Sequence, residues 1–272
     1  MHYKLISDLD KTTRLDSQDR GLHYGDGLFE TMLLSDGHIK YWPEHYARLS
    51  LSAKKLYIDC PDKSWFEQKL KPFIDLEQRL VIKIILNRGS GGRGLNFPDD
   101  LVSNIYLLKY KTDKTSLIQS VKAMFSDITL PVNHNLAGLK HLNRLDYVLA
   151  TQQLKGKGKF NEALLLNHNG HVIEGIVNNL FFVKSEQIYT PDLKFSGVNG
   201  IMRELVIKKL KQRGKKVKIS NYTKNDIETA DECFLCNSVQ GIRPIIQLED
   251  IHFTIGKTSK DLQNIIHGHS GN

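Results

Sequence analysis

A lysine near the middle of the chain has the side chain with the most distinctive potential chemistry. Lys140 lies within residues 138–147 and comes just before a stretch of helical character. In a confined site of low dielectric a lysine loses affinity for its proton, and the neutral amine can form an imine with an aldehyde or act as a base. Because most lysines are solvated surface charges, Lys140 gains significance only from the segments that accompany it.

Four such segments surround Lys140 in the sequence. Residues 24–31 read YGDGLFET, and Arg48 follows them. A basic, glycine-rich stretch, RGSGGRG, spans residues 88–94. Downstream, residues 174–179 begin with a glutamate, and residues 197–203 read GVNGIMR.

In this order the segments resemble the fold-type IV family of pyridoxal-phosphate enzymes, which includes branched-chain and D-amino-acid aminotransferases and aminodeoxychorismate lyases. The resemblance extends from about residue 19 to about residue 244. It is strongest to the lyases, through residues 88–94, 136–145 and 197–203, whereas residues 24–31 mark only the broader family. The resemblance implies an α+β fold of two mixed domains, with the active site in the cleft between them.

The resemblance also implies catalytic roles for two residues. Lys140 would hold the aldehyde of pyridoxal 5'-phosphate and move protons, and Glu174 would keep the ring nitrogen protonated. Glu174 directly follows Val172 and Ile173, which indicates a partly buried position. A surface glutamate at the end of a hairpin strand is the alternative interpretation.

A bound phosphate requires hydrogen-bond donors and positive charge. The segment from Gly200 opens a predicted helix, whose free N–H groups and dipole attract a dianion. Arg48 matches the family's phosphate-binding arginine, although by itself it is typical of a surface helix charge. Ser238 stands where many relatives have threonine or alanine. A contact of the Ser238 hydroxyl with the phosphate is a further expectation. The remaining predicted cofactor contacts are Ile201, Met202, Asn178, Asn179 and Asn237.

The stretch at residues 88–94 contains the pattern G-x-G-x-x-G, but the residues after it do not begin a helix, as a dinucleotide-binding loop requires. A flexible basic loop with Arg88 and Arg93 predicts recognition of substrate carboxylates instead. A plain surface turn is the alternative. Tyr24 and Thr31 complete the predicted substrate contacts.

Composition narrows the classes of function. The 272 residues are 40% hydrophobic and 25% charged, with a net charge of +8, which suits an anionic small molecule, nucleic acid or acidic membrane face without choosing among them. Cys233 and Cys236 lie three apart on a predicted strand and point to opposite faces, so they predict neither a metal site nor a disulfide. The longest apolar stretch, residues 80–86, is too short to span a membrane. No signal pattern begins the chain, and we expect a cytoplasmic protein.

The periodicity predicts mixed strands and helices in two domains, residues 1–112 and 120–272, joined by a linker at 113–119. The predicted strands are 28–34, 38–42, 79–87, 103–111, 120–126, 162–167, 171–173, 180–184, 187–190, 216–220, 232–236 and 242–248. The predicted helices are 43–57, 63–76, 143–155, 200–213 and 259–266. The second domain is expected to carry the lysine.

The function that the resemblance implies is a homodimeric lyase that converts 4-amino-4-deoxychorismate into 4-aminobenzoate and pyruvate in folate synthesis. A fold-type IV aminotransferase acting on D-amino acids or branched-chain amino acids is the alternative. A basic nucleic-acid-binding protein is a third hypothesis, but it predicts interleaved aromatic and basic residues on exposed strands. The predicted strands are mainly aliphatic, and we expect no nucleic-acid partner.

Overall fold

The computed structural model describes residues 3–7, 15–74, 79–112 and 120–267. These residues form two compact units. One comprises the described residues of Met1–Lys114 together with Leu139–Asn143, and the other comprises the described residues of Thr115–Gly138 and Arg144–Asn272. The predicted linker at 113–119 lies outside the described residues. The α+β architecture in two mixed units agrees with the prediction, but the segment with Lys140 groups with the first unit rather than the second.

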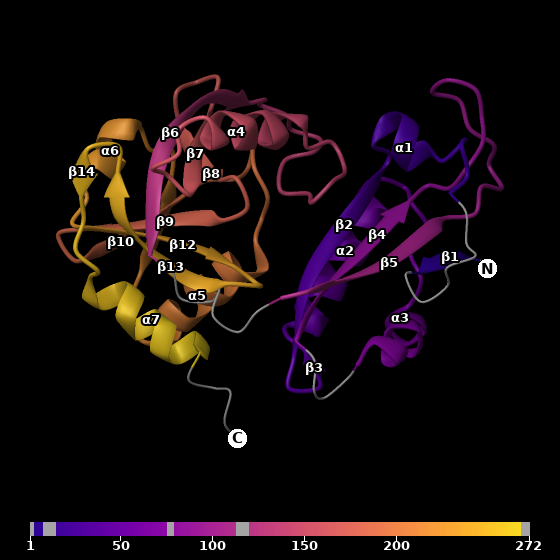
Figure 1. The fold of residues 1–272 in the computed structure, drawn as a ribbon, viewed down its shortest axis with the longest axis horizontal. Helices are drawn as coiled ribbons and strands as arrows, with labels where there is room; N and C mark the ends of the chain where they lie inside the picture. Colours follow the sequence, from indigo (N-terminus) through magenta and orange to yellow (C-terminus); the bar gives the residue numbers. More distant parts are fainter. Residues whose placement is uncertain (1–2, 8–14, 75–78, 113–119, 268–272) are drawn as a thin grey trace. The chain divides into compact units, whose positions relative to one another are not determined.

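The first unit is built on a five-stranded sheet in the order β1-β5-β4-β2-β3 (Figure 1). Its strands are β1 (Lys4–Ser7), β2 (Gly27–Ser35), β3 (His38–Ile39), β4 (Leu80–Asn87) and β5 (Asn104–Lys111). From Leu80 to Leu86 buried and half-buried residues alternate along β4, so Ile82 and Ile84 share the buried face with Leu80 and Leu86. Helix α2 (Trp42–Lys55) packs on β2 and buries Leu49 and Ala53.

Short helices connect the strands of the first unit. In α1 (Arg20–Tyr24) the Asp19 side chain caps the first turn by accepting a hydrogen bond from the Leu22 N–H. Helix α3 (Lys63–Leu70) ends earlier than the predicted 63–76 and continues as the single 3₁₀ turn Lys71–Phe73. Pro72 lies in that turn, and a proline has no backbone N–H with which to continue an α-helix.

The second unit contains a nine-stranded sheet in the order β11-β10-β9-β12-β13-β6-β7-β8, with β14 paired to β13. Its strands are β6 (Val121–Leu130), β7 (Glu162–Asn167), β8 (Val172–Gly175), β9 (Asn179–Lys184), β10 (Gln187–Pro191), β11 (Val217–Ser220), β12 (Glu232–Asn237), β13 (Gly241–Leu248) and β14 (Ile251–His252). An additional pairing of β8 with β9, through Glu174 and Asn179, closes six of these strands into a ring. Two predicted site residues therefore lie at the closure of the sheet.

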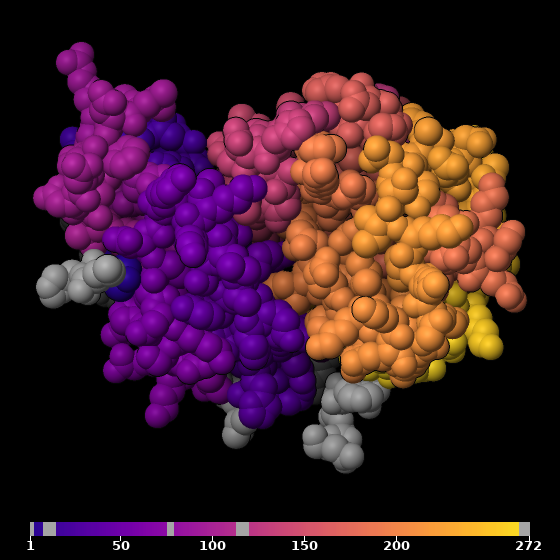
Figure 2. Space-filling view, turned by 180° about the vertical axis from the view of Figure 1, so that it is seen from behind, coloured from indigo at the N-terminus to yellow at the C-terminus, as the bar shows by residue number. Residues whose placement is uncertain are grey.

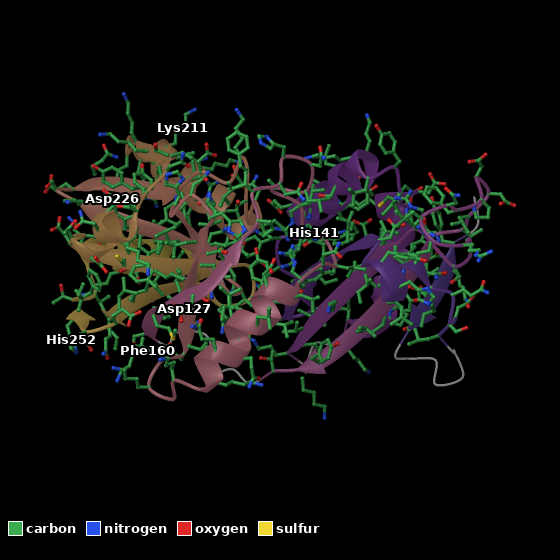
Figure 3. The ribbon with its side chains drawn as sticks, turned by 90° about the horizontal axis from the view of Figure 1, so that it is seen from above. Asp127, His141, Phe160, Lys211, Asp226 and His252 are labelled. Carbon is green, nitrogen blue, oxygen red and sulfur yellow. The ribbon has the colours of Figure 1, made fainter. Side chains whose placement is uncertain are left out.

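Helices cover this sheet (Figure 1). They are α4 (Leu145–Lys155), α5 (Ile201–Gln212), α6 (Lys224–Glu228) and α7 (Lys257–His267). Helix α4 packs on β6 and β7, α5 on β12 and α7 on β13. Charged and polar side chains such as Lys211 and His252 point outward from the second unit (Figure 3). Among the described helices, none has the length and apolar character that a membrane span requires.

The core of the second unit is largely aliphatic and aromatic. Phe181 and Phe234 are fully buried and stack with 5.2 Å between ring centroids. Cys233 and Cys236 are buried on β12, and both are free thiols. Burial raises the pKa of Cys236 to about 12, so the thiol stays protonated at neutral pH. The interpretation of these cysteines as small buried hydrophobes agrees with the structure.

Replacement of Phe234 by alanine tests the packing of this core. We expect Phe234→Ala to lower the free energy of unfolding by about 3–5 kcal/mol, because it removes a fully buried ring and leaves a cavity. Urea denaturation followed by circular dichroism measures the change. Val177→Ala, at a side chain that is 65% exposed, is the matched control and should shift the value by less than about 0.5 kcal/mol. Equal effects of the two substitutions would contradict the assignment of Phe234 to the core.

Candidate active site

The predicted site residues fall into two groups, one in each unit. The first unit holds Tyr24, Thr31, Arg48, Arg88, Arg93 and Lys140. The second unit holds Glu174, Asn178, Asn179, Gly200, Ile201, Met202, Asn237 and Ser238. Each group lies on the strands, helices and loops of its own unit.

Backbone pairing with the start of β2 places Lys140. The Phe29 N–H donates to the Lys140 carbonyl at 2.9 Å, and the Leu142 N–H donates to the Gly27 carbonyl at 2.9 Å. The Lys140 side chain is half-buried, and its Nζ lies 4.3 Å from the centroid of the Phe29 ring. Residue His141, which Figure 3 labels, directly follows it. Lys140 is thus held over an aromatic face, where a cation is stabilised by the ring.

A second lysine shares the Phe29 ring. The Nζ of Lys83 lies 5.0 Å from the ring centroid, and the register of β2 with β4 sets Lys83 opposite Thr31. Side chains two apart on a strand share a face, so Thr31 and Phe29 point to the same side of β2. Burial lowers the pKa of the Lys83 amine. No sequence motif predicted a role for Lys83, although a single lysine in the otherwise apolar residues 80–86 was a usable signal.

Arg48 binds a carboxylate on the opposite face of β2. Glu30 follows Phe29 and is 1% exposed, and its carboxylate accepts from Arg48 Nε at 2.7 Å and Arg48 Nη2 at 2.5 Å. His45 Nδ1 lies 2.6 Å from Glu30 Oε2. Burial by itself would raise the pKa of Glu30, but the charge of Arg48 and the hydrogen bonds from His45 and Arg48 outweigh it and hold the pKa at about 2. A phosphate contact for Arg48 stays a prediction.

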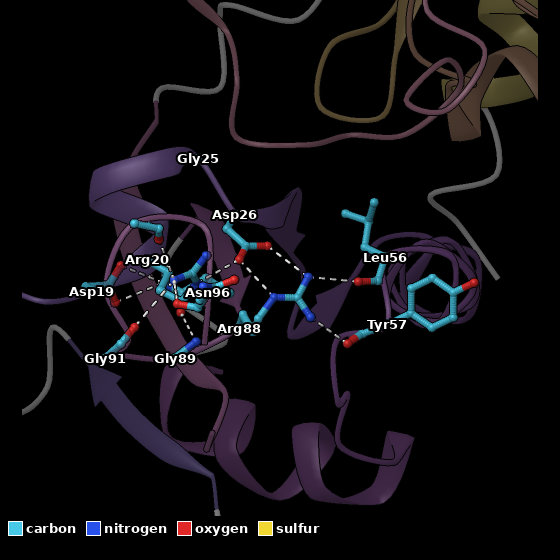
Figure 4. A network of polar contacts seen from close by, with 12 residues as sticks. Asp19, Arg20, Gly25, Asp26, Leu56, Tyr57, Arg88, Gly89, Gly91 and Asn96 are labelled. Carbon is cyan, nitrogen blue, oxygen red and sulfur yellow. Dashed lines mark hydrogen bonds and ion pairs between the residues drawn. The ribbon is translucent and has the colours of Figure 1, made fainter. Parts of the chain in front are cut away.

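Arg88 is engaged by the protein itself (Figure 4). Its Nε and Nη2 donate to the two oxygens of Asp26 at 2.8 and 3.0 Å. Its Nη1 and Nη2 also donate to the carbonyls of Tyr57 at 2.7 Å and Leu56 at 2.9 Å. These contacts use four of the five N–H groups of a guanidinium, so they do not support the predicted contact of Arg88 with a substrate carboxylate. Arg93 is exposed instead.

In the second unit Glu174 is a buried carboxylate with several donors. It is 4% exposed, and Oε1 accepts from the Tyr147 hydroxyl at 2.6 Å. Oε2 accepts from Asn179 Nδ2 at 3.0 Å, and the Val198 N–H lies 3.1 Å from both oxygens. Hydrogen bonds to the charged form favour an ionised carboxylate. The surface alternative for Glu174 is therefore wrong.

Tyr147 contacts the predicted site residue Glu174, and no sequence motif indicated a role for it. It lies in the first turn of α4, on the side that also carries the buried Ala150. Burial, followed by the negative charge of Glu174, raises the pKa of the Tyr147 hydroxyl well above its ordinary value. The hydroxyl therefore stays protonated and acts as a donor to Glu174. Its i, i+3 spacing with Ala150 was the available sequence signal.

The start of α5 can hold an anion. Gly200 is the N-cap residue and provides no side-chain cap, so the first N–H groups of the helix, from Ile201 and Met202, are not capped by a side chain. A Cβ at Gly200 would lie 1.8 Å from Asn179 Oδ1, which explains the glycine. Asn179 Nδ2, in turn, donates to Glu174 and to the Val198 carbonyl. A helix start that could hold an anion thus adjoins the buried carboxylate of Glu174, and the two would fit the phosphate and the ring nitrogen of pyridoxal phosphate.

A buried polar network holds the turn after β12. Asn237 Nδ2 donates to Asn178 Oδ1 at 2.7 Å, and Asn237 Oδ1 accepts from the N–H groups of Val239 and Gln240. Asn178 Nδ2 donates to the buried carboxylate of Glu162. Both asparagine side chains therefore position the turn that contains Ser238. Cofactor contacts of Asn178, Asn237 and Ser238 stay predictions.

The chain is similar to several known proteins. The sequence model of the family described as Amino-transferase class IV matches residues 27–248. The chain is 32% identical over 260 residues to the aminodeoxychorismate lyase of Vibrio harveyi, which covers 92% of this chain and 95% of that one. It is 27% identical over 240 residues to the D-alanine aminotransferase of Bacillus licheniformis, and the alignment covers 86% of this chain and 83% of that protein. The solved structure of the 4-amino-4-deoxychorismate lyase from Pseudomonas aeruginosa superposes with a TM-score of 0.88 at 32% identity, over 97% of this chain and 98% of that one.

The ion pair of Glu30 predicts a pH-dependent stability of the first unit. Because its pKa is about 2 in the folded state against 4.5 ordinarily, the carboxylate should contribute about 3 kcal/mol at pH 7. This contribution is complete above about pH 4.5 and is lost as the pH falls towards 2. We expect Glu30→Gln to lower the free energy of unfolding strongly at pH 7, and the difference from the native protein to narrow at pH 3.5.

Both tryptophans, Trp42 and Trp65, belong to the first unit, so tryptophan fluorescence in urea reports its unfolding. Glu44→Gln, at an exposed carboxylate of α2, is the control and should be near neutral at both pH values. A difference between Glu30→Gln and the native protein that stays constant from pH 7 to pH 3.5 would contradict the assigned ion pair.

Proposed function

Since the chain belongs to the class IV amino-transferase family, a family of enzymes, we propose that it is a pyridoxal-phosphate-dependent lyase that converts 4-amino-4-deoxychorismate into 4-aminobenzoate and pyruvate. The observation that carries this proposal is the buried Glu174 carboxylate, which Tyr147 and Asn179 hold beside the uncapped start of α5. A protonated pyridine ring with a phosphate requires this pair of features. Similarity to lyases over nearly the whole chain supports the lyase reaction.

Each residue has a distinct task in the proposed site. When bound, the cofactor supplies a ring that withdraws electrons from the carbon next to the substrate's amine. Glu174 would accept a hydrogen bond from the ring N–H and keep that nitrogen protonated, while Tyr147 and Asn179 keep the carboxylate ionised and oriented. The N–H groups at the start of α5 would bind the phosphate.

Lys140 would hold the cofactor's aldehyde and, once released, act as the base. Its Nζ would remove the proton from the ring carbon that bears the amine. Breaking the bond between the ring and the enolpyruvyl oxygen then makes the ring aromatic, which drives the step. The same Nζ would deliver the proton to the methylene carbon of the enolpyruvate, so that pyruvate leaves. Thr31 and Lys83, on the Phe29 face, are further polar groups that we assign to substrate.

An aminotransferase for D-amino acids or branched-chain amino acids is the second candidate, because a D-alanine aminotransferase is also similar over most of the chain. Both reactions would use Lys140 and Glu174. The exposed Arg93 suits a carboxylate in either type of substrate. The homodimeric state and the cytoplasmic location stay predictions.

A pyruvate assay separates the two reactions. We expect the purified protein, loaded with pyridoxal phosphate, to release pyruvate and 4-aminobenzoate from aminodeoxychorismate when no keto acid is added. Borohydride reduction followed by peptide mapping should place the cofactor on Lys140, and Lys140→Ala should abolish both signals. Turnover that occurs only with an amino donor and a keto acceptor would contradict the lyase assignment and support the aminotransferase.

Removal of the Tyr147 hydroxyl tests how Glu174 is held. We expect Tyr147→Phe to lower kcat about tenfold, because hydrogen bonds to charged groups are worth about 1.5–3 kcal/mol. Glu174→Gln should lower kcat further, because an amide cannot keep the ring nitrogen protonated. Tyr189→Phe, at a half-buried tyrosine of β10, is the matched control. An unchanged kcat in Tyr147→Phe would remove Tyr147 from the site.

A further inference from the structure

Arg20 occupies the centre of the glycine-rich loop at residues 89–97 (Figure 4). Its side chain is only 3% exposed. Its Nε donates to Asp26 Oδ2 at 3.0 Å, and its Nη1 faces the carbonyls of Gly91, Gly94 and Asn96 at 3.4, 3.3 and 3.5 Å. One guanidinium therefore gathers three carbonyl groups from along the loop.

The loop backbone can adopt this shape only because of its glycines. Gly89, Gly91, Gly92 and Gly94 all have φ between 63° and 121°. A Cβ at Gly92 would lie 2.3 Å from the Asn96 carbonyl oxygen. The carbonyl dipoles of Gly91, Gly94 and Asn96 converge on one point, and this convergence is unfavourable unless a donor lies between them. Arg20 supplies the positive charge that this backbone requires.

Both ends of the loop are tied to the same cluster. Asp26 Oδ2 accepts from Arg20 Nε and also from Arg88 Nε, at the start of the loop. The Phe97 ring, at its end, lies 5.0 Å from the Arg20 guanidinium carbon and 4.5 Å from that of Arg88. The loop is thus held at its start, middle and end. In the space-filling view its purple to magenta residues lie at the surface of the first unit (Figure 2).

Arg93 is the arginine of the loop that does not help to hold the loop in shape. It is exposed, and its side chain has no hydrogen bond or ion pair with any residue in the described part of the chain. We propose that Arg20 is a positioning residue for substrate recognition: through the loop carbonyls it fixes the one loop shape that presents Arg93 to a carboxylate of the substrate. A recognition group that is held in place before binding loses less entropy when the ligand arrives. The proposal rests on the proposed function in that the substrate bears carboxylates.

A double-mutant cycle of Arg20→Met and Arg93→Ala tests the proposal. Each single variant should raise KM for aminodeoxychorismate about tenfold and change kcat by less than about twofold. The double variant should have nearly the same KM as either single variant, because Arg20 acts through Arg93. Hydrogen exchange of the amides at 89–97 should be faster in Arg20→Met and unchanged in Arg93→Ala. Multiplicative KM effects, or an unchanged KM in Arg20→Met, would overturn the proposal.

Two further variants separate this role from a general structural one. Arg79→Met removes another partly buried arginine of the same unit, at the opposite end of β4, and should leave KM unchanged. Gly94→Ala strains the loop at φ 63° although no atom lies within 4 Å of the added Cβ. Gly94→Ala should raise KM, and adding Arg93→Ala to it should cause no further increase. If Arg20→Met does not fold, Gly94→Ala decides the question, and an unchanged KM in that variant overturns the proposal.

Failure of the proposed function is detected separately from failure of the Arg20 proposal, by measuring the native protein. A native protein that releases no pyruvate from aminodeoxychorismate contradicts the lyase assignment and leaves the role of Arg20 to be measured on the aminotransferase reaction. The same cycle is then run with D-alanine or L-leucine as the donor and 2-oxoglutarate as the acceptor. The criterion for KM is unchanged, because these substrates also carry carboxylates.

Discussion

Buried carboxylates that must be satisfied by donors organise this protein. An ionised carboxylate that leaves water without partners costs far more free energy than a typical domain can spare. Glu174 meets this requirement with a phenol, an amide and a backbone N–H, drawn from α4, β9 and the segment before α5. The same requirement makes the closure of β8 on β9 important, because that pairing brings Asn179 next to Glu174.

In the first unit the same constraint determines what the arginines do. Glu30 engages Arg48 in a forked pair, and Asp26 engages Arg20 and Arg88. Part of the positive charge of the arginines is therefore neutralised within the unit, by the buried Glu30 and the half-buried Asp26. The positive charge left for a ligand is smaller and more localised than the overall +8 indicates.

The face of β2 that carries Phe29 shows how a strand separates two tasks. Side chains alternate between the faces, so Glu30 and Met32 pack beneath α2 while Phe29 and Thr31 share the face with Lys83 and Lys140. One face of β2 thus supports the unit, while the other presents an aromatic ring and a hydroxyl, to which Lys83 of β4 and Lys140 add their amines. In the second unit the buried Asn178 and the half-buried Asn237 have the supporting role, because they hold the turn at Ser238.

Local patterns in the sequence determined most of the elements and the chemical identity of the main groups. Alternation and helical spacing predicted the long strands and helices, whereas β1, α1, α6 and β14 are too short to show a period and were missed. Lys140, Glu174 and the helix start at Gly200 could be named from their motifs. Only the tertiary structure decided which arginine is engaged, since Arg88 and Asp26 are 62 residues apart and meet through the register of β2 with β4. The same holds for Tyr147 on Glu174 and for Lys83 and Lys140 at the Phe29 ring, because strand pairing and helix docking bring together residues whose partners no local pattern specifies.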